Sequence, residues 1–202
     1  MKRYLLPLLL AGMLTACAND PVYPPAPAKA SGAADWMYLL GPGDSVNVFV
    51  WGNPEVSGSF PIRPDGKMTM NLVEDMPASG KTTSQLARDI EKVLARYIQD
   101  PVVTVVVSGG VGPFSQQIRV VGQAAKPQAL NYRENMSLVD VMISVGGLAE
   151  FAAGNRASIL RIVDGKPQQF SVRLEDLVKG GDISANVEMR PGDLLVIPES
   201  WF

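Results

Sequence analysis

The sequence is short of the side chains on which most enzyme and metal chemistry depends. Its 202 residues include no histidine and a single cysteine, Cys17. Histidine is the most frequent general acid or base, and histidine and cysteine supply most transition-metal ligands. One cysteine also cannot form an intramolecular disulfide. We therefore expect a protein that is not an enzyme, has no metal or cofactor, and is held together by its hydrophobic core.

The sequence also lacks an excess of positive charge and long apolar runs. The chain has 18 basic and 20 acidic residues, a net charge of −2, so we expect no polycationic surface for nucleic acid. The apolar stretch near the N-terminus, Tyr4 to Leu14, has about 11 residues, whereas a helix needs roughly 20 to cross a bilayer. Pro7 interrupts this stretch as well. A transmembrane anchor is therefore not expected.

The N-terminus has the order of an export signal. Two basic residues precede the apolar stretch, and small residues follow it directly before Cys17. Leu14-Thr15-Ala16-Cys17 resembles the lipobox of bacterial lipoproteins, in which the cysteine carries the lipid and becomes the new N-terminus. The resemblance implies a signal peptide over residues 1–16, cleavage between Ala16 and Cys17, and anchoring through lipid on Cys17. The alternative is an ordinary signal with a cysteine near the cleavage site by chance.

Residues 17–35 have the composition of a tether. Four prolines stand among Ala, Ser and Gly between Ala18 and Asp35, with no hydrophobic periodicity. Such a segment is expected to be unstructured and could hold the folded part up to about 50 Å from the membrane. Ala18 stands where enterobacterial inner-membrane lipoproteins carry a retaining aspartate. The resemblance therefore implies the periplasmic face of the outer membrane.

Residues 36–110 predict a first folded unit. The turn Gly41-Pro42-Gly43-Asp44 precedes a strand whose apolar residues include Trp51, which we expect in the core. Thr82 and Gln85 have capping-box spacing, and apolar residues at helical spacing predict an amphipathic helix that ends at Asp100-Pro101. The run Val102 to Val107 then predicts a strand covered on both faces.

A Gly-rich stretch at residues 108–113 marks the expected boundary, and residues 115–202 predict a second, mostly β unit. It has a strand at 117–121, a helix that begins at Ser137 and ends at Gly146-Gly147, a hairpin around Asp164-Gly165, and a last strand at 194–197. The fold class is therefore α+β.

The candidate binding groups have ordinary structural explanations as well. The turns Gly41-Pro42-Gly43-Asp44 and Pro191-Gly192-Asp193 could line a channel, but turn formation explains them better. Glu74 and Asp75 could act on a glycan, but solvation at the surface is the default for an acidic pair. Trp51, Trp201 and Phe202 could stack on sugar rings, but core packing explains Trp51 better. Trp201 and Phe202 are candidates for docking on a neighbouring copy or a partner.

The order of these motifs resembles a known family. Tyr38 to Asp44, Arg63-Pro64-Asp65-Gly66, and Thr82 to Val103 resemble the periplasmic domain of the outer-membrane polysaccharide export (Wza-like) proteins. Residues Ile118 to Pro198 resemble the β-grasp SLBB module that follows that domain. Within the family, the chain looks closest to the short exopolysaccharide export proteins of exosortase-linked (PEP-CTERM) loci. Larger members add a second β-grasp module and a membrane-spanning helix, for which we expect no residues here.

The resemblance implies a periplasm-facing outer-membrane lipoprotein that forms a ring and conducts exopolysaccharide toward a separate outer-membrane pore. The implied partners are further copies of the chain, an inner-membrane chain-length regulator with a tyrosine kinase, an outer-membrane β-barrel, the polymer and the membrane. A monomeric glycan-binding or scaffolding lipoprotein is the alternative. An envelope hydrolase would need a catalytic constellation that the sequence does not offer.

Overall fold

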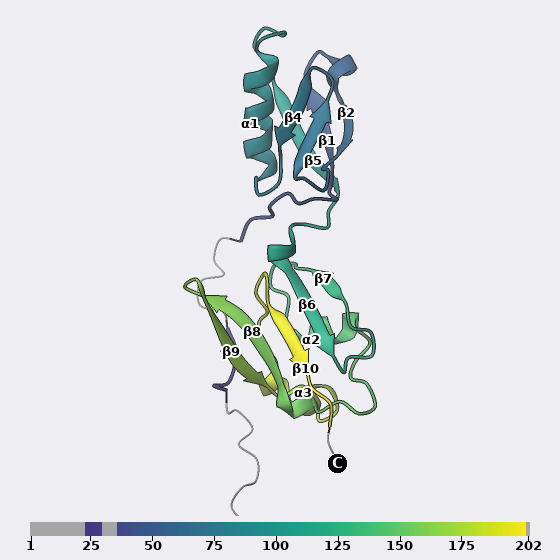
Figure 1. Cartoon of the computed structure of the whole chain (residues 1–202), viewed down its shortest axis with the longest axis vertical. Helices are drawn as coiled ribbons and strands as arrows, with labels where there is room; N and C mark the ends of the chain where they lie inside the picture. The colour runs from purple at the N-terminus through teal and green to yellow at the C-terminus, as the bar shows by residue number, and fades with distance from the viewer. Residues whose placement is uncertain (1–22, 30–35, 201–202) are drawn as a thin grey trace, which may run out of the picture.

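The computed structural model describes residues 23–29 and 36–200, and it confirms the α+β fold class. Figure 1 shows two units that follow each other along the long axis of the molecule. Each unit has its own cluster of buried apolar side chains, one drawn from residues 40–105 and the other from residues 118–197.

The first unit combines a three-stranded antiparallel sheet, a hairpin and one long helix. The sheet has the order β2-β1-β5, and a separate two-stranded sheet pairs β3 with β4. Helix α1 and the β3-β4 hairpin pack on the same side of the larger sheet (Figure 1). The bounds are β1 (Ser45–Val50), β2 (Gly58–Pro61), β3 (Lys67–Met70), β4 (Val73–Pro77), α1 (Thr83–Leu94) and β5 (Val103–Gly109), with a short 3-10 turn η1 (Pro54–Val56).

Helix α1 begins where the sequence predicts and ends earlier. Thr82 is the N-cap, and its hydroxyl accepts from the Gln85 N–H at 3.2 Å while the Gln85 side chain accepts from the Thr82 N–H at 2.9 Å. The predicted end at Asp100-Pro101 is wrong, because the helix stops at Leu94. Leu94 is the last fully buried apolar residue of the periodic set, whereas Tyr97 is 62% exposed and has no core to join.

Two expectations about the sheet are wrong. The buried positions of β1 are Val46, Val48 and Val50. Because side chains alternate between the two faces of a strand, Phe49 lies on the exposed face. Trp51, in the turn that follows β1, is exposed as well. Strand β5 is buried on one face only, since α1 and the β3-β4 hairpin lie on the same side of the sheet.

The second unit is a five-stranded mixed sheet of order β7-β6-β10-β8-β9. The last strand, β10, lies between β6 and β8, parallel to the first and antiparallel to the second. Apolar side chains of α2 and α3 join its core. The bounds are η2 (Phe114–Gln116), β6 (Gln117–Gly122), β7 (Ala129–Asn131), α2 (Leu138–Ser144), η3 (Gly154–Arg156), β8 (Ala157–Val163), β9 (Lys166–Val172), α3 (Leu174–Val178), η4 (Ile183–Ala185) and β10 (Leu194–Ile197).

The turns of the second unit follow the chemistry read from the sequence. Gly146 and Gly147 both have positive φ, and the Gly147 N–H donates to the Met142 carbonyl at 2.8 Å to close α2. Asp164 and Gly165 join β8 to β9 with positive φ at both positions, as a two-residue hairpin turn requires. The assignment of this unit to the SLBB class of β-grasp modules stays a prediction.

Candidate functional site

The residues singled out for anchoring and docking lie outside the described part of the chain. Ala16 and Cys17 precede it, and Trp201 and Phe202 follow it. The nearest described residues are 23–29 on the side of Cys17 and Ser200 on the side of Trp201. The Ser200 N–H donates to the Phe151 carbonyl at 2.8 Å.

Part of the predicted tether is bound to the second unit. Ser171 of β9 holds it by three contacts: its N–H donates to the Pro24 carbonyl at 2.8 Å, its carbonyl accepts from the Ala26 N–H at 3.1 Å, and its hydroxyl donates to the Tyr23 carbonyl at 3.1 Å. The Glu188 N–H donates to the Ala28 carbonyl at 3.1 Å. The expectation of an unstructured tether is thus wrong for this stretch, because an edge strand offers unpaired backbone groups even to a Pro-rich segment. We call residues 23–28 the strap.

Asp44 of the first Pro-Gly-Asp turn is a buried acceptor for four groups. Its Oδ2 accepts from the Gly41 N–H at 2.8 Å and the Tyr38 hydroxyl at 2.7 Å. Its Oδ1 accepts from the N–H groups of Val111 at 2.6 Å and Gly112 at 2.8 Å. Burial, followed by the bond to Asp44, raises the pKa of the Tyr38 hydroxyl well above its ordinary value. The carboxylate thereby fixes the segment that leads from the first unit to the second.

Asp193 of the second Pro-Gly-Asp turn has a comparable role. It is fully buried and accepts from Arg161 Nε at 2.9 Å and Nη2 at 2.6 Å, and from the Arg190 N–H at 2.8 Å. The Arg161 guanidinium also lies 6.0 Å from the centre of the Phe170 ring. Both turns therefore organise buried hydrogen bonds, which agrees with the structural explanation for them.

The two units meet at a small aromatic and polar junction. The Trp36 ring meets the rings of Tyr132 and Tyr38 edge to face at 5.0 and 6.4 Å. The Gln116 side chain accepts from the Leu39 N–H at 3.4 Å. Asn131 Nδ2 donates to the Gly110 carbonyl at 3.0 Å, so β7 also contacts the connecting segment.

An exposed aromatic pair stands on the first unit. Trp51 is 72% exposed and Phe49 is 53% exposed, and their rings meet edge to face at 6.3 Å. The expectation that Trp51 packs in the core is wrong, because β1 buries its three valines instead. The sequence signal that could have shown this is the alternation of Val46, Val48 and Val50, because it places Trp51 on the opposite face.

The acidic pair has no catalytic arrangement in the described structure. Glu74 and Asp75 are both exposed, and Asp75 pairs with Arg63 at 2.6 Å. Arg63 also binds Asp65, and this bond lowers the pKa of the Asp65 carboxyl to about 2. Within residues 23–29 and 36–200, no group of three or more His, Cys, Asp or Glu side chains could hold a metal ion.

No helix among the described residues combines the length and the apolar character needed to cross a membrane.

Comparison with known proteins relates the first unit to a family. Residues 32–108 match the family described as polysaccharide biosynthesis/export protein. The EPS I polysaccharide export outer membrane protein EpsA of Ralstonia nicotianae is 25% identical over 187 residues, which cover 80% of this chain and 47% of that protein. The exopolysaccharide production protein ExoF of Rhizobium meliloti is 29% identical over 143 residues, 65% of this chain and 33% of that protein.

The chain spans about half the length of EpsA and a third of the length of ExoF. The family match covers nearly all of the unit that contains β1 to β5 and α1, and the alignment with EpsA extends over most of the chain. Residues 32–108 are therefore similar to the polysaccharide biosynthesis/export family, and most of the chain is similar to an outer-membrane polysaccharide export protein.

Proposed function

We propose that this protein is a periplasm-facing outer-membrane lipoprotein of an exopolysaccharide export machine. The observation that carries the proposal is the family match over residues 32–108, which fold as one unit around their own core. The names of the similar proteins, which describe exopolysaccharide export and production, agree with it. The absence of histidine and the lone cysteine support a role without catalysis.

A single copy is too small to conduct a polymer. A surface cavity of about 600 Å³ in the second unit, lined by residues such as Asn131 and Arg133, has the size of a small-molecule site. Passage of a hydrated polysaccharide would therefore need several copies around one axis. A closed ring of identical subunits is the simplest such assembly.

The strap supports an orientation for each copy. If Cys17 carries the lipid, only five residues, 18–22, separate it from Tyr23, so the two Cα atoms are six steps apart along the chain. At about 3.3–3.6 Å per extended residue these steps span at most roughly 20 Å. The strap contacts β9 and the segment near Glu188, both in the second unit. The second unit would then lie next to the outer membrane, with the first unit directed into the periplasm.

This orientation gives each proposed partner a place. The first unit would face the inner-membrane chain-length regulator and its tyrosine kinase, from which polymer arrives. The second unit would face a separate outer-membrane β-barrel that supplies the pore.

Deletion of the gene tests the export role. We expect the deletion strain to lose secreted polymer, and a plasmid copy of the gene to restore it. Normal amounts of capsule or matrix polymer from the deletion strain would contradict the proposal. Light scattering of the purified lipidated chain tests the ring separately, since a monomer at all concentrations would contradict ring assembly.

A further inference from the structure

The outer face of the β2-β1-β5 sheet is open and apolar. Its exposed side chains include Trp51 at 72%, Val102 at 57%, Val106 at 56% and Phe49 at 53%. The other face of this sheet packs on α1 and the β3-β4 hairpin (Figure 1). A contiguous exposed patch of large apolar side chains usually marks a binding surface.

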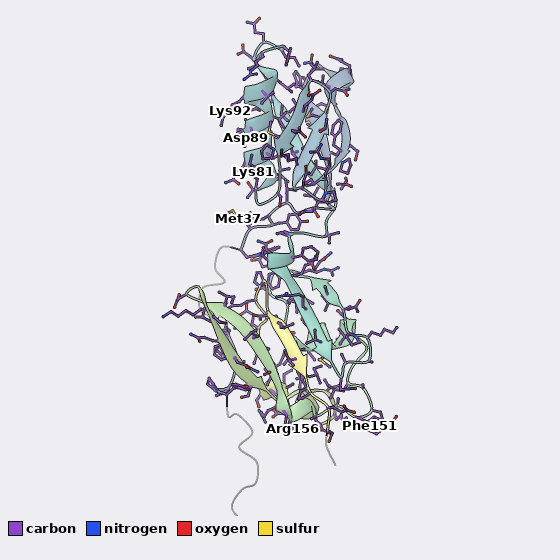
Figure 2. The ribbon with its side chains drawn as sticks, viewed as in Figure 1. Met37, Lys81, Asp89, Lys92, Phe151 and Arg156 are labelled. Carbon is purple, nitrogen blue, oxygen red and sulfur yellow. The ribbon has the colours of Figure 1, made fainter. Side chains whose placement is uncertain are left out.

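The same face lacks charge. Strands β1, β2 and β5 contain no Asp, Glu, Lys or Arg, although β2 and β5 are the sheet edges, where charged residues commonly prevent unwanted pairing. The helix side of the unit is the opposite: Asp89 accepts from Lys81 at 2.7 Å and from Lys92 at 3.3 Å (Figure 2). A ligand for the sheet face therefore needs no charge of its own.

Polar groups stand next to the aromatic pair. The strand register places Asn47 directly opposite Ser59, and Phe49 directly opposite Thr104. In each of these two pairs the Cβ atoms of directly opposite residues are typically about 4.5–5.5 Å apart, on one face of the sheet. In the described part of the chain, the side chains of Asn47, Ser59 and Thr104 make no hydrogen bond that would occupy them. An amide and two hydroxyls thus remain available beside two aromatic rings.

The aromatic pair is held in place by the backbone. The Trp51 N–H donates to the Val102 carbonyl at 3.0 Å, and Asn53 Nδ2 donates to the Trp51 carbonyl at 2.9 Å. The Phe49 ring supports the indole at an interplanar angle of 73°. Little conformational freedom of the backbone would be lost on binding, which favours affinity.

We propose that this face, defined by Asn47, Phe49, Trp51, Ser59 and Thr104, binds uncharged sugar rings of the transported polysaccharide. A sugar ring has an apolar C–H surface that suits an aromatic face and a rim of hydroxyls that suits amide and hydroxyl groups. From Asn47 to Trp51 the face is about 13 Å long, at 3.3–3.4 Å per residue, and exceeds a single ring. The inference rests on the export role and assigns the polymer a contact surface.

A second copy of the chain fits this face less well. The helix side of the unit carries Lys81, Asp89, Lys92 and Arg88, and burying those charges against an uncharged sheet would be costly. Pairing of two identical sheet faces would give a two-fold dimer instead of a ring. A polymer of neutral rings meets neither difficulty.

Binding by the lipidated full chain in detergent tests the inference. The probe is a set of oligosaccharides released by mild acid hydrolysis from the polymer that the organism secretes, measured by isothermal titration. We expect Trp51→Ala to weaken binding at least tenfold and Trp51→Tyr to retain most of it. Phe114→Ala is the matched control, because Phe114 is an aromatic of the second unit that is 76% exposed. It should bind as the unchanged protein does.

Three results would overturn the inference: no binding by the unchanged chain, equal binding by Trp51→Ala, or dissociation of the oligomer in Trp51→Ala without any sugar binding. The last would identify the face as a contact between copies. The export role is judged separately. If the deletion strain loses secretion while Trp51→Ala restores it and binds sugar normally, the export role stands and the sugar site does not.

Discussion

Arg161 and Asp193 form a buried ion pair in the core of the second unit, with Nη2 and Oδ2 2.6 Å apart and side chains 3% and 1% exposed. Arg161 comes from β8 and Asp193 immediately precedes β10, so the pair bridges adjacent strands. Asp44 precedes β1 in the first unit, also after Pro-Gly, and is equally buried. In each unit a buried carboxylate thus stands immediately before a central strand of the sheet.

Asp193→Ala should destabilise the second unit strongly. The change leaves the Arg161 guanidinium buried without its counter-charge, which typically costs about 3–5 kcal/mol. Chemical denaturation of the full chain measures the loss. Glu150→Ala removes an exposed carboxylate and should stay within about 0.5 kcal/mol. Similar losses in the two variants would show that the ion pair contributes nothing specific.

Asp44→Ala should loosen the connection between the units. It removes the acceptor for the Val111 and Gly112 N–H groups, and a buried donor left without a partner costs about 1–3 kcal/mol. We expect a lower free energy of unfolding for the first unit and faster hydrogen exchange at these two amides. Asp44→Asn keeps one acceptor oxygen and should be intermediate. Unchanged exchange at both amides in Asp44→Ala would contradict the assigned role.

Replacing residues 23–28 with a Gly-Ser segment of equal length should release the strap. Without the fixed backbone of the prolines, the segment loses more conformational entropy on docking. The Ser171 and Glu188 amides, which donate to the strap, should then exchange faster with deuterium. The Leu195 amide in the central strand should be unaffected. Equal protection of Ser171 in both proteins would mean that the prolines are not needed for docking.

The stabilising effect of Asp140 should depend on pH. Hydrogen bonds from the Ser137 hydroxyl at 2.6 Å and N–H at 2.9 Å lower the pKa of the Asp140 carboxyl below its ordinary value of 3.8. A lowered pKa stabilises the fold above pH 3.8, and this effect is lost as the pH falls through the lowered pKa. Asp140→Ala should therefore cost about 1 kcal/mol at pH 7 and less below pH 3. Unfolding curves at both pH values measure this difference, and Glu74→Ala should show little change at either. A cost for Asp140→Ala that does not depend on pH would contradict the assignment.

Local signals in the sequence predicted much of the fold. The capping box at Thr82, the turn at Asp164-Gly165 and the end of α2 at Gly146-Gly147 depend on nearby residues, and the structure has all three. The errors concern contacts between distant segments. The strap needs an unpaired edge of β9 that lies far along the chain, and the exposure of Trp51 depends on which face of β1 the helix covers.

The candidate site depends less on local sequence than the fold does. Cys17 follows from a local motif, whereas the sheet face around Trp51 is assembled from strands that are up to about 57 residues apart in sequence, from Asn47 to Thr104. The sequence favoured turn formation for the two Pro-Gly-Asp motifs, and the structure adds that their carboxylates are buried acceptors. That feature needs the partners Val111, Gly112 and Arg161, which no local pattern identifies.

The most direct test of the account follows newly made polymer in a gene-deletion strain that carries either the unchanged gene or Cys17→Ser. After a pulse of labelled sugar, the ratio of extracellular to cell-retained polymer is measured together with the membrane fractionation of the protein. We predict that the unchanged gene restores extracellular polymer, and that the Cys17→Ser protein leaves the membrane fraction while labelled polymer is retained in the cells. Full export by Cys17→Ser protein that is no longer in the membrane fraction would contradict the account.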